Sequence, residues 1–207
     1  MLPAALLTAG ALGWLLVADK NGSSGRLLAK PLASAGFLAV ALTAGALDSS
    51  FGRWMLAGLV LSALGDLFLL SQSEAAFLAG LGGFLTAHVL FAVAFLVRGI
   101  APVGLVAAVA LGLFAWQVLR WLSPHLSDRM RAPVTVYALV ISLMGVLAVA
   151  TAIDSWDARI PIGALFFIVS DLAVARDNFV APGFPNRLVG LPLYYGGQLL
   201  LAWAAGG

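Results

Sequence analysis

The chain of 207 residues is too apolar for a soluble domain, because 62% of its residues are hydrophobic, only 10% are charged, and the mean hydropathy is +1.05. The 11 basic residues give a formal charge of +2, and because they lie mostly between the apolar segments they indicate orientation in a membrane and no nucleic-acid partner. The absence of cysteine excludes disulfides, thiolate nucleophiles and zinc sites with cysteine ligands.

Apolar segments follow one another along the whole chain, so we predict one membrane domain over residues 1–207. Each segment is close to the roughly 20 residues that a helix needs to cross a bilayer. None alternates polar and apolar residues as the strands of a barrel do. The sequence therefore predicts an all-α membrane protein, a bundle of eight transmembrane helices. The predicted spans are, in chain order, residues 2–18, 32–47, 54–71, 77–97, 102–121, 133–153, 160–175 and 188–205.

The first segment is predicted to be a span and not a cleaved signal peptide, because no basic region precedes it and no small-residue cleavage context follows it. The third and seventh segments share a short pattern, a small residue followed by Asp and Leu, and they run in the same direction. This repeat predicts two four-helix halves related by an axis along the membrane normal.

Lys and Arg are distributed unevenly between the connections, which predicts the orientation in the membrane. The odd-numbered connections hold Lys20, Arg26, Lys30, Arg120, Arg129, Arg131, Arg176 and Arg187, and the even-numbered ones hold only Arg53, Arg98 and Arg159. We therefore expect the odd-numbered connections in the cytoplasm and both termini outside. The expected location is a cell membrane, the inner membrane if the source is bacterial.

Two aspartates stand inside predicted spans, Asp66 in the third and Asp171 in the seventh. Ionisable side chains are costly in hydrocarbon and by default mark functional sites, although a hydrogen-bonded aspartate can also serve only helix packing. Two nearby carboxyl groups can divide into a proton donor and a proton acceptor. Acid-catalysed cleavage of a C–O bond needs this division, since one group supplies a proton and the other activates water or stabilises a cation. The spacing alone leaves open whether the two groups are adjacent.

Further polar side chains are predicted near the same depth, with His88 close to the middle of its span. They are Lys30, His88, Tyr137, Tyr194, Tyr195 and Gln198. Ordinary alternatives are a buried hydrogen-bonding histidine, interfacial tyrosines and an orienting lysine. With only His88 and His125 in the chain, a histidine-rich zinc site is excluded and a carboxylate-based one is left open. We predict no metal and no cofactor.

Several short motifs, in order along the chain, resemble the YhhN family of membrane proteins. They are Lys30-Pro31, Gly65-Asp66 with Phe68-Leu69, the stretch from Phe84 to His88, Tyr137, Gly163-Ala164 through Ser170-Asp171, and Tyr194-Tyr195 with Gln198. The resemblance covers nearly the full length, and it implies an eight-span helical membrane protein.

The resemblance also implies a lysoplasmalogenase-like hydrolase, which cleaves the vinyl ether bond of a lysoplasmalogen to a fatty aldehyde and glycerophosphoethanolamine or glycerophosphocholine. Asp66 and Asp171 are then the catalytic acid and base, in either order. The residues implied to bind or orient the lysophospholipid, among membrane lipids, are Lys30, His88, Tyr137, Ser170, Tyr194, Tyr195 and Gln198.

Three alternatives stay open at this point. The substrate can be another lysolipid, ether or ester. The same aspartates can serve a proton-coupled transporter of small molecules or lipids, or the chain can bind lipid without turnover. The oligomeric state is not predicted.

Overall fold

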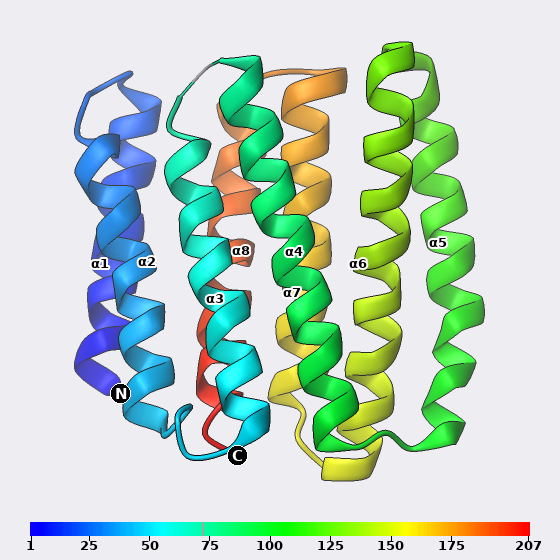
Figure 1. The fold of residues 1–207 in the computed structure, drawn as a ribbon. Coiled ribbons are helices and arrows are strands. Elements are labelled where there is room, and N and C mark those ends of the chain that lie inside the picture. The colour runs from blue at the N-terminus through cyan, green and yellow to red at the C-terminus, as the bar shows by residue number, and fades with distance from the viewer. Residues whose placement is uncertain (72) are drawn as a thin grey trace.

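The computed structural model describes residues 1–71 and 73–207, and within these ranges the chain is all-helical, with eight α-helices (Figure 1). The α-helices are α1 (Leu2–Lys20), α2 (Arg26–Ala44), α3 (Ser50–Phe68), α4 (Glu74–Arg98), α5 (Ala107–Leu122), α6 (Asp128–Ser155), α7 (Arg159–Ala175) and α8 (Phe184–Ala204). Two short 3-10 helices, η1 (Pro102–Val106) and η2 (Ser123–His125), flank α5, and α7 continues into a π-helical turn, η3 (Arg176–Val180). The predicted all-α fold is confirmed.

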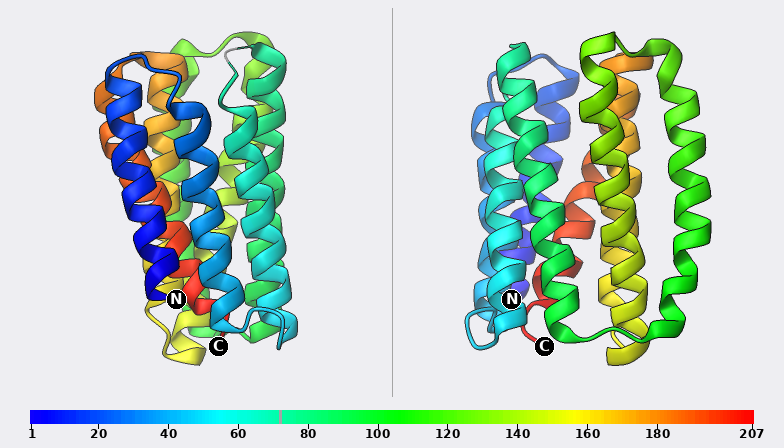
Figure 2. Two further views of the ribbon diagram at one scale, coloured as in Figure 1. Left: turned by 90° about the vertical axis from the view of Figure 1, so that its left-hand side faces the viewer. Right: turned by 45° about the vertical axis from the view of Figure 1, so that its right-hand side comes forward.

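The helices run alternately up and down, so the connections lie at the two ends of the bundle (Figures 1 and 2). Both chain termini lie at one end, which we call the terminal end. The connections that follow α1, α5 and α7 lie at the opposite, distal end. Helix α8 packs against α1 and α2 as well as α7, so contacts join the first and the last helices of the chain, and the division into two four-helix halves stays a prediction. Helix α5 stands at the edge and packs on α6.

Helix α2 begins at Arg26, six residues before the predicted span, and places Pro31 inside it. The prediction took the proline as the opening of the helix, because proline has no N–H to donate. Pro31 is the sixth residue of α2, so the carbonyl of Leu27 loses its usual N–H donor, yet the helix continues through this position. The consequence is that Lys30 stands on a regular helix, with its side chain turned into the bundle and only 9% of the residue exposed.

Glycines allow close contacts between α7 and α8 and between α3 and α4. A Cβ on Gly163 or Gly197 would come within 3.1 or 2.8 Å of the other's carbonyl oxygen, so α7 and α8 approach backbone to backbone. A Cβ on Gly65 of α3 would lie 2.8 Å from the Phe84 ring of α4. Small residues of this kind are how helices pack closely in lipid, where apolar side chains gain little from leaving their surroundings.

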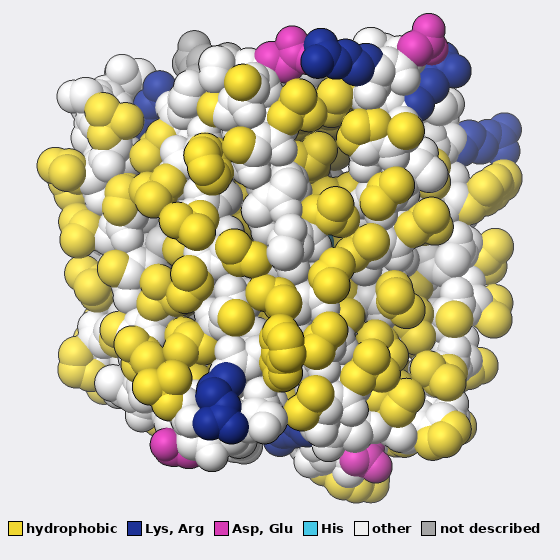
Figure 3. Space-filling model, in the orientation of Figure 1, with side chains coloured by type: hydrophobic (Ala, Val, Ile, Leu, Met, Phe, Trp, Pro, Cys, Tyr) yellow, Lys and Arg dark blue, Asp and Glu magenta, His cyan; other side chains and the backbone are white. Residues whose placement is uncertain are grey.

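The long sides of the bundle are covered with apolar side chains, and the charged ones in this view gather at its two ends (Figure 3). In the described ranges, six segments are long and apolar enough to cross a membrane by length and composition: α1 to α4, α6, and residues Pro102–His125 around α5. Helices α7 and α8 are not among these six.

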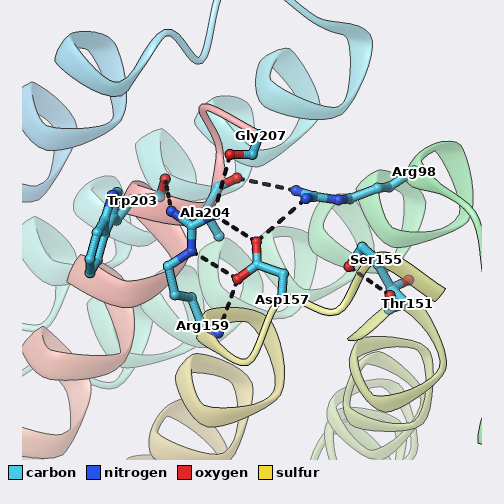
Figure 4. A network of polar contacts seen from close by, with 8 residues as sticks. All are labelled: Arg98, Thr151, Ser155, Asp157, Arg159, Trp203, Ala204 and Gly207. Carbon is cyan, nitrogen blue, oxygen red and sulfur yellow. Dashed lines mark hydrogen bonds and ion pairs between the residues drawn. The ribbon is translucent and has the colours of Figure 1, made fainter. Parts of the chain in front are cut away.

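A network of arginines ties the helices together at the terminal end (Figure 4). Arg159 forms two 2.8 Å contacts with the carboxylate of Asp157, and Arg98 Nη2 lies 3.4 Å from it. Both arginines also donate to carbonyl oxygens at the end of α8, those of Trp203 and Ala204. Burial opposes ionisation of Asp157, but the hydrogen bonds and charge of Arg159, helped by Arg98, hold the pKa of Asp157 below its ordinary value.

Candidate active site

A cavity of about 460 Å³ opens at the distal end and reaches Asp66 and Asp171, and all eight α-helices contribute to its wall. The wall is divided by polarity. On the side of α1, α2, α8 and η3 it is charged, with Asp19, Arg26, Lys30, Asp177 and Arg187. On the side of α5 and α6 it is apolar, with Phe114, Val118, Leu122, Val134 and Ile141. Such a cavity fits a molecule with one charged end and one hydrocarbon end.

Asp66 is 2% exposed and receives three donors. Lys30 Nζ lies 3.2 Å from its Oδ1. The hydroxyls of Ser34 and Tyr194 donate to its Oδ2 at 2.7 and 2.8 Å. Lys30 and Ser34 lie one turn apart on α2, so both reach the same carboxyl group from one helix face. A group that accepts from three donors and gives none has the hydrogen-bond pattern of a carboxylate.

Asp171 belongs to a second cluster. Its Oδ2 accepts a hydrogen bond from the Tyr137 hydroxyl at 2.7 Å and lies 3.2 Å from His88 Nε2. His88 Nε2 also lies 3.1 Å from the Tyr137 oxygen. The side chain of Asp171 is 18% exposed and lines the cavity, and its Oδ1 has no hydrogen-bond partner in the described part of the chain. Asp171 therefore has one anchored oxygen and one oxygen available to a ligand.

His88 is fully buried, and its Nδ1 has no hydrogen-bond partner among the described residues. A neutral imidazole carries one N–H, and a buried N–H without an acceptor is rare in native proteins. A proton on Nε2 would instead point towards the oxygens of Asp171 and Tyr137. The surroundings thus favour the tautomer in which His88 donates towards the Asp171 cluster.

An aromatic contact chain connects the two clusters. The Tyr194 ring, whose hydroxyl bonds Asp66, lies 5.5 Å from the Phe167 ring, and Phe167 lies 4.4 Å from the ring of His88. No direct hydrogen bond joins the two aspartates within the described residues. They are two separately supported groups on one cavity wall, and they do not share a proton as a contacting dyad does.

The structure brings six of the nine predicted site residues onto the cavity wall. These are Lys30, Asp66, Tyr137, Ser170, Asp171 and Tyr194. His88 reaches the site through Asp171. Tyr195 and Gln198 are fully buried but do not line the cavity; the Tyr195 hydroxyl donates to the Lys30 carbonyl, and the Gln198 amide has no partner among the described residues. Ser170 donates to the Phe167 carbonyl at 2.7 Å.

The sequence reasoning missed Ser34, Arg26 and Arg187. Ser34 could have been found from its position one turn after Lys30 on the same helix face. The arginines were assigned to membrane orientation, and nothing in the sequence placed them at a cavity mouth. Within the described ranges, no group of three or more His, Asp or Glu side chains is arranged to hold a metal ion.

Comparison with known proteins identifies the family. The model of the YhhN family matches residues 25–205. The chain belongs to the YhhN family. No solved structure matches it.

Several relatives of this YhhN protein carry the same name. It is 36% identical to lysoplasmalogenase TMEM86A of Bos taurus over 154 residues, which are 72% of this chain and 63% of that protein. It is also 36% identical to the lysoplasmalogenase of Mycobacterium tuberculosis over 168 residues, 76% of this chain and 62% of that one. It is 34% identical to human lysoplasmalogenase TMEM86B over 177 residues, which are 84% of this chain and 71% of that protein. The chain thus spans less than two thirds of the length of the first two. The family and the apolar helices make it a multi-pass membrane protein.

Proposed function

We propose that this YhhN protein is an intramembrane hydrolase of lysoplasmalogen type, which cleaves the vinyl ether bond of a single-chain glycerophospholipid. The observation that carries the proposal is the cavity divided by polarity, with two separately hydrogen-bonded carboxyl groups on its wall, the buried Asp66 and the partly exposed Asp171. The names of the relatives support the vinyl ether as the bond that is cleaved, since those proteins are called lysoplasmalogenases.

The cavity supports an orientation for the substrate. The hydrocarbon chain lies along the apolar wall of α5 and α6, and the charged end lies on the side of α1, α2 and α8. Asp171 comes from α7 and Tyr137 from α6, so this pair lies next to the part of the wall that contacts the hydrocarbon chain of the substrate. A vinyl ether joins the hydrocarbon to the glycerol, and its reactive carbons would therefore lie beside these two residues.

Asp171 is the proposed proton donor. Cleavage starts when the vinyl carbon beta to the ether oxygen takes a proton, which leaves an oxocarbenium ion. Asp171 Oδ2 is anchored by Tyr137, and Oδ1 has no hydrogen-bond partner among the described residues, so we assign the transferred proton to Oδ1. His88 and Tyr137 hold the carboxyl group in place, and a positioned acid of this kind contributes roughly 10²–10⁴-fold to a rate.

Asp66 is the proposed carboxylate partner. Its negative charge stabilises the cationic intermediate, and it accepts a proton from the attacking water. Water adds to the carbon that bears the ether oxygen and forms a hemiacetal. The hemiacetal collapses to the fatty aldehyde and the glycerol hydroxyl, and the proton taken up by Asp66 is returned through solvent to Asp171. Lys30, Ser34 and Tyr194 keep Asp66 oriented throughout.

We also propose that all eight α-helices cross a cell membrane, with the distal end in the cytoplasm and both termini outside. Four basic residues lie within the four helix residues nearest the distal end, namely Lys20, Arg120, Arg131 and Arg187, whereas Arg98 and Arg159 are helix-end residues at the terminal end. This bias supports the orientation by the positive-inside rule.

The arginine network at the terminal end supports hydrolysis over transport. Arg98, Asp157 and Arg159 connect α4, α8 and the connection before α7, at the end opposite the cavity mouth (Figure 4). A transporter must open to both sides in turn, and here that step would break several charged contacts. Proton-coupled uptake by protein-containing liposomes would overturn this preference.

The test of the proposed function is an assay of the purified protein in D₂O with a 1-alkenyl lysophospholipid. The mechanism predicts a fatty aldehyde that carries a single deuterium on the carbon next to the aldehyde group, because that carbon is protonated from solvent-exchanged Asp171. The saturated 1-alkyl analogue is the matched control, since it has no double bond to protonate. Aldehyde without that deuterium, or equal cleavage of the 1-alkyl lipid, would refute the mechanism.

A further inference from the structure

Two cavities meet at the distal end of the bundle. The second, of about 400 Å³, lies on the side of α1, α2 and α8, and Asp19, Arg26 and Arg187 line both cavities. These three side chains therefore stand at the passage between the outer surface and the space that holds Asp66. They are among the charged groups that a charged end of a substrate in the inner cavity can contact.

The guanidinium of Arg26 makes no hydrogen bond or ion pair within the described part of the chain, although the residue is half-buried. Arg187 is 43% exposed and contacts two carboxylates, with Nη1 at 3.6 Å from Asp19 and Nε at 3.4 Å from Asp177. Charge-assisted hydrogen bonds of this type are normally about 2.7–2.9 Å long. Arg187 is thus held in position by two loose contacts and keeps donors free for a ligand.

Asp177 is itself fixed in place. Its Oδ1 accepts hydrogen bonds from the backbone N–H of Gly183 at 2.7 Å and from Nδ2 of Asn186 at 2.9 Å. These bonds tie the π-helical turn after α7 to the start of α8. Arg187 therefore stands on the first turn of α8, which these bonds connect to the π-helical turn, and Asp19 and Asp177 orient its side chain.

The geometry points to Arg26 and Arg187 as the binding site for the phosphate diester of the lipid substrate, an inference that rests on the proposed function for the identity of that lipid. The guanidinium fork matches the oxygens of a phosphate, and arginine is preferred where such groups are recognised. Lys30 is engaged by Asp66, so it is not free to take the phosphate. Asp19 and Asp177 act as positioning residues for Arg187.

The depth of the two sites agrees with this assignment. Arg26 and Lys30 lie four residues apart on α2, which corresponds to about 6 Å along the helix axis. Lys30 contacts Asp66, so it indicates the depth at which Asp66 lies in the bundle. A phosphate at Arg26 therefore leaves one helix turn for the glycerol backbone before the ether bond reaches the carboxyl groups, a length that an extended glycerol unit fills.

The experiment measures binding without turnover. The probes are 1-alkyl glycerophosphoethanolamine, which lacks the vinyl bond, and 1-alkylglycerol, which also lacks the phosphate. Their Kd values are compared for the wild-type protein in nanodiscs, for Arg26→Gln and Arg187→Gln, and for Arg129→Gln as the matched control. Arg129 lies at the same end, pairs among the described residues only with the exposed Glu74, and is not on the lining of either cavity there.

We expect Arg26→Gln and Arg187→Gln to raise the Kd of the phospholipid probe about tenfold or more, and to leave the Kd of 1-alkylglycerol unchanged. Unchanged binding of 1-alkylglycerol also shows that the variants are folded. Arg129→Gln should match the wild type for both probes. An equal effect on both probes, or none, overturns the site. Arg26-dependent binding of inorganic phosphate, together with phospholipid binding that does not depend on Arg26, assigns the site to free phosphate and overturns its lipid role.

The failure of this inference is distinguishable from failure of the proposed function. If the phospholipid probe binds in an arginine-dependent way and the 1-alkenyl lipid is not cleaved, the phosphate site stands and the hydrolase does not. If the 1-alkenyl lipid is cleaved and the arginine variants bind normally, the hydrolase stands and the phosphate site does not.

Discussion

Replacing Lys30 by methionine is expected to destabilise the protein by about 3–5 kcal/mol, because the change leaves a buried carboxylate without its counter-ion. The ammonium lies 3.2 Å from Asp66 Oδ1, and the two side chains are only 11% and 3% exposed. Methionine fills a similar volume, so the loss is one of charge and not of packing. The hydroxyls of Ser34 and Tyr194 remain as donors, but both bond Oδ2 and leave Oδ1 bare.

The free energy of unfolding is measured by reversible unfolding in mixed micelles with SDS, followed by far-UV circular dichroism. The double variant Lys30→Met with Asp66→Asn removes both charges and should recover most of the loss, since a buried pair contributes little net stability compared with neutral residues. Arg129→Met is the control, because its exposed pair with Glu74 contributes at most about 1 kcal/mol. The reasoning is wrong if Lys30→Met unfolds within 1 kcal/mol of the wild type, or if the double variant is no more stable than the single one.

Three further predictions concern other parts of the molecule. Tyr137→Phe removes the 2.7 Å hydrogen bond to Asp171 and should lower aldehyde release by about tenfold with the helical content unchanged; unaltered kcat would contradict the role of the hydroxyl. The lowered pKa of Asp157 stabilises the fold at pH values above its unfolded pKa of about 3.9, and this stabilisation is lost as pH falls through the lower folded pKa. Acid titration of stability should therefore be shallower in Asp157→Asn, and an identical titration would be evidence against the network. Gly52→Ala should cost about 1–3 kcal/mol, because its Cβ meets two backbone carbonyls, whereas Gly82→Ala meets nothing and should be neutral or slightly stabilising; thermal unfolding separates the two.

The helices were largely predictable, because apolar length alone identifies a segment that can lie in a bilayer. The boundaries were less so. Ser49 accepts a hydrogen bond from the Gly52 N–H and starts α3 four residues before the predicted span, and α2 starts six residues early and continues through Pro31. Both differences arise from local capping and backbone chemistry, which hydropathy does not report.

The two aspartates were recognisable as site residues because a carboxyl group in an apolar helix needs a reason to be there. Their partners depend on how the helices are rotated relative to one another, and the spacing of residues along the sequence does not determine that rotation. Asp66 pairs with Lys30 and Ser34 of α2, and nothing in the sequence predicted these partners. The phosphate-site arginines were concealed by their second role, since positive charge at a helix end serves orientation equally well.

The central claim is that Asp171 donates the proton that breaks the vinyl ether bond. The direct measurement is the rate of aldehyde release from a 1-alkenyl lysophospholipid by purified Asp171→Asn, compared with the wild type and with Asp128→Asn at a side chain that is 96% exposed. Asparagine keeps the shape and the bond from Tyr137 but has no acidic proton, so we expect release to fall by about 10²–10⁴-fold while lipid binding is retained and Asp128→Asn stays fully active. Wild-type release by Asp171→Asn would contradict the account.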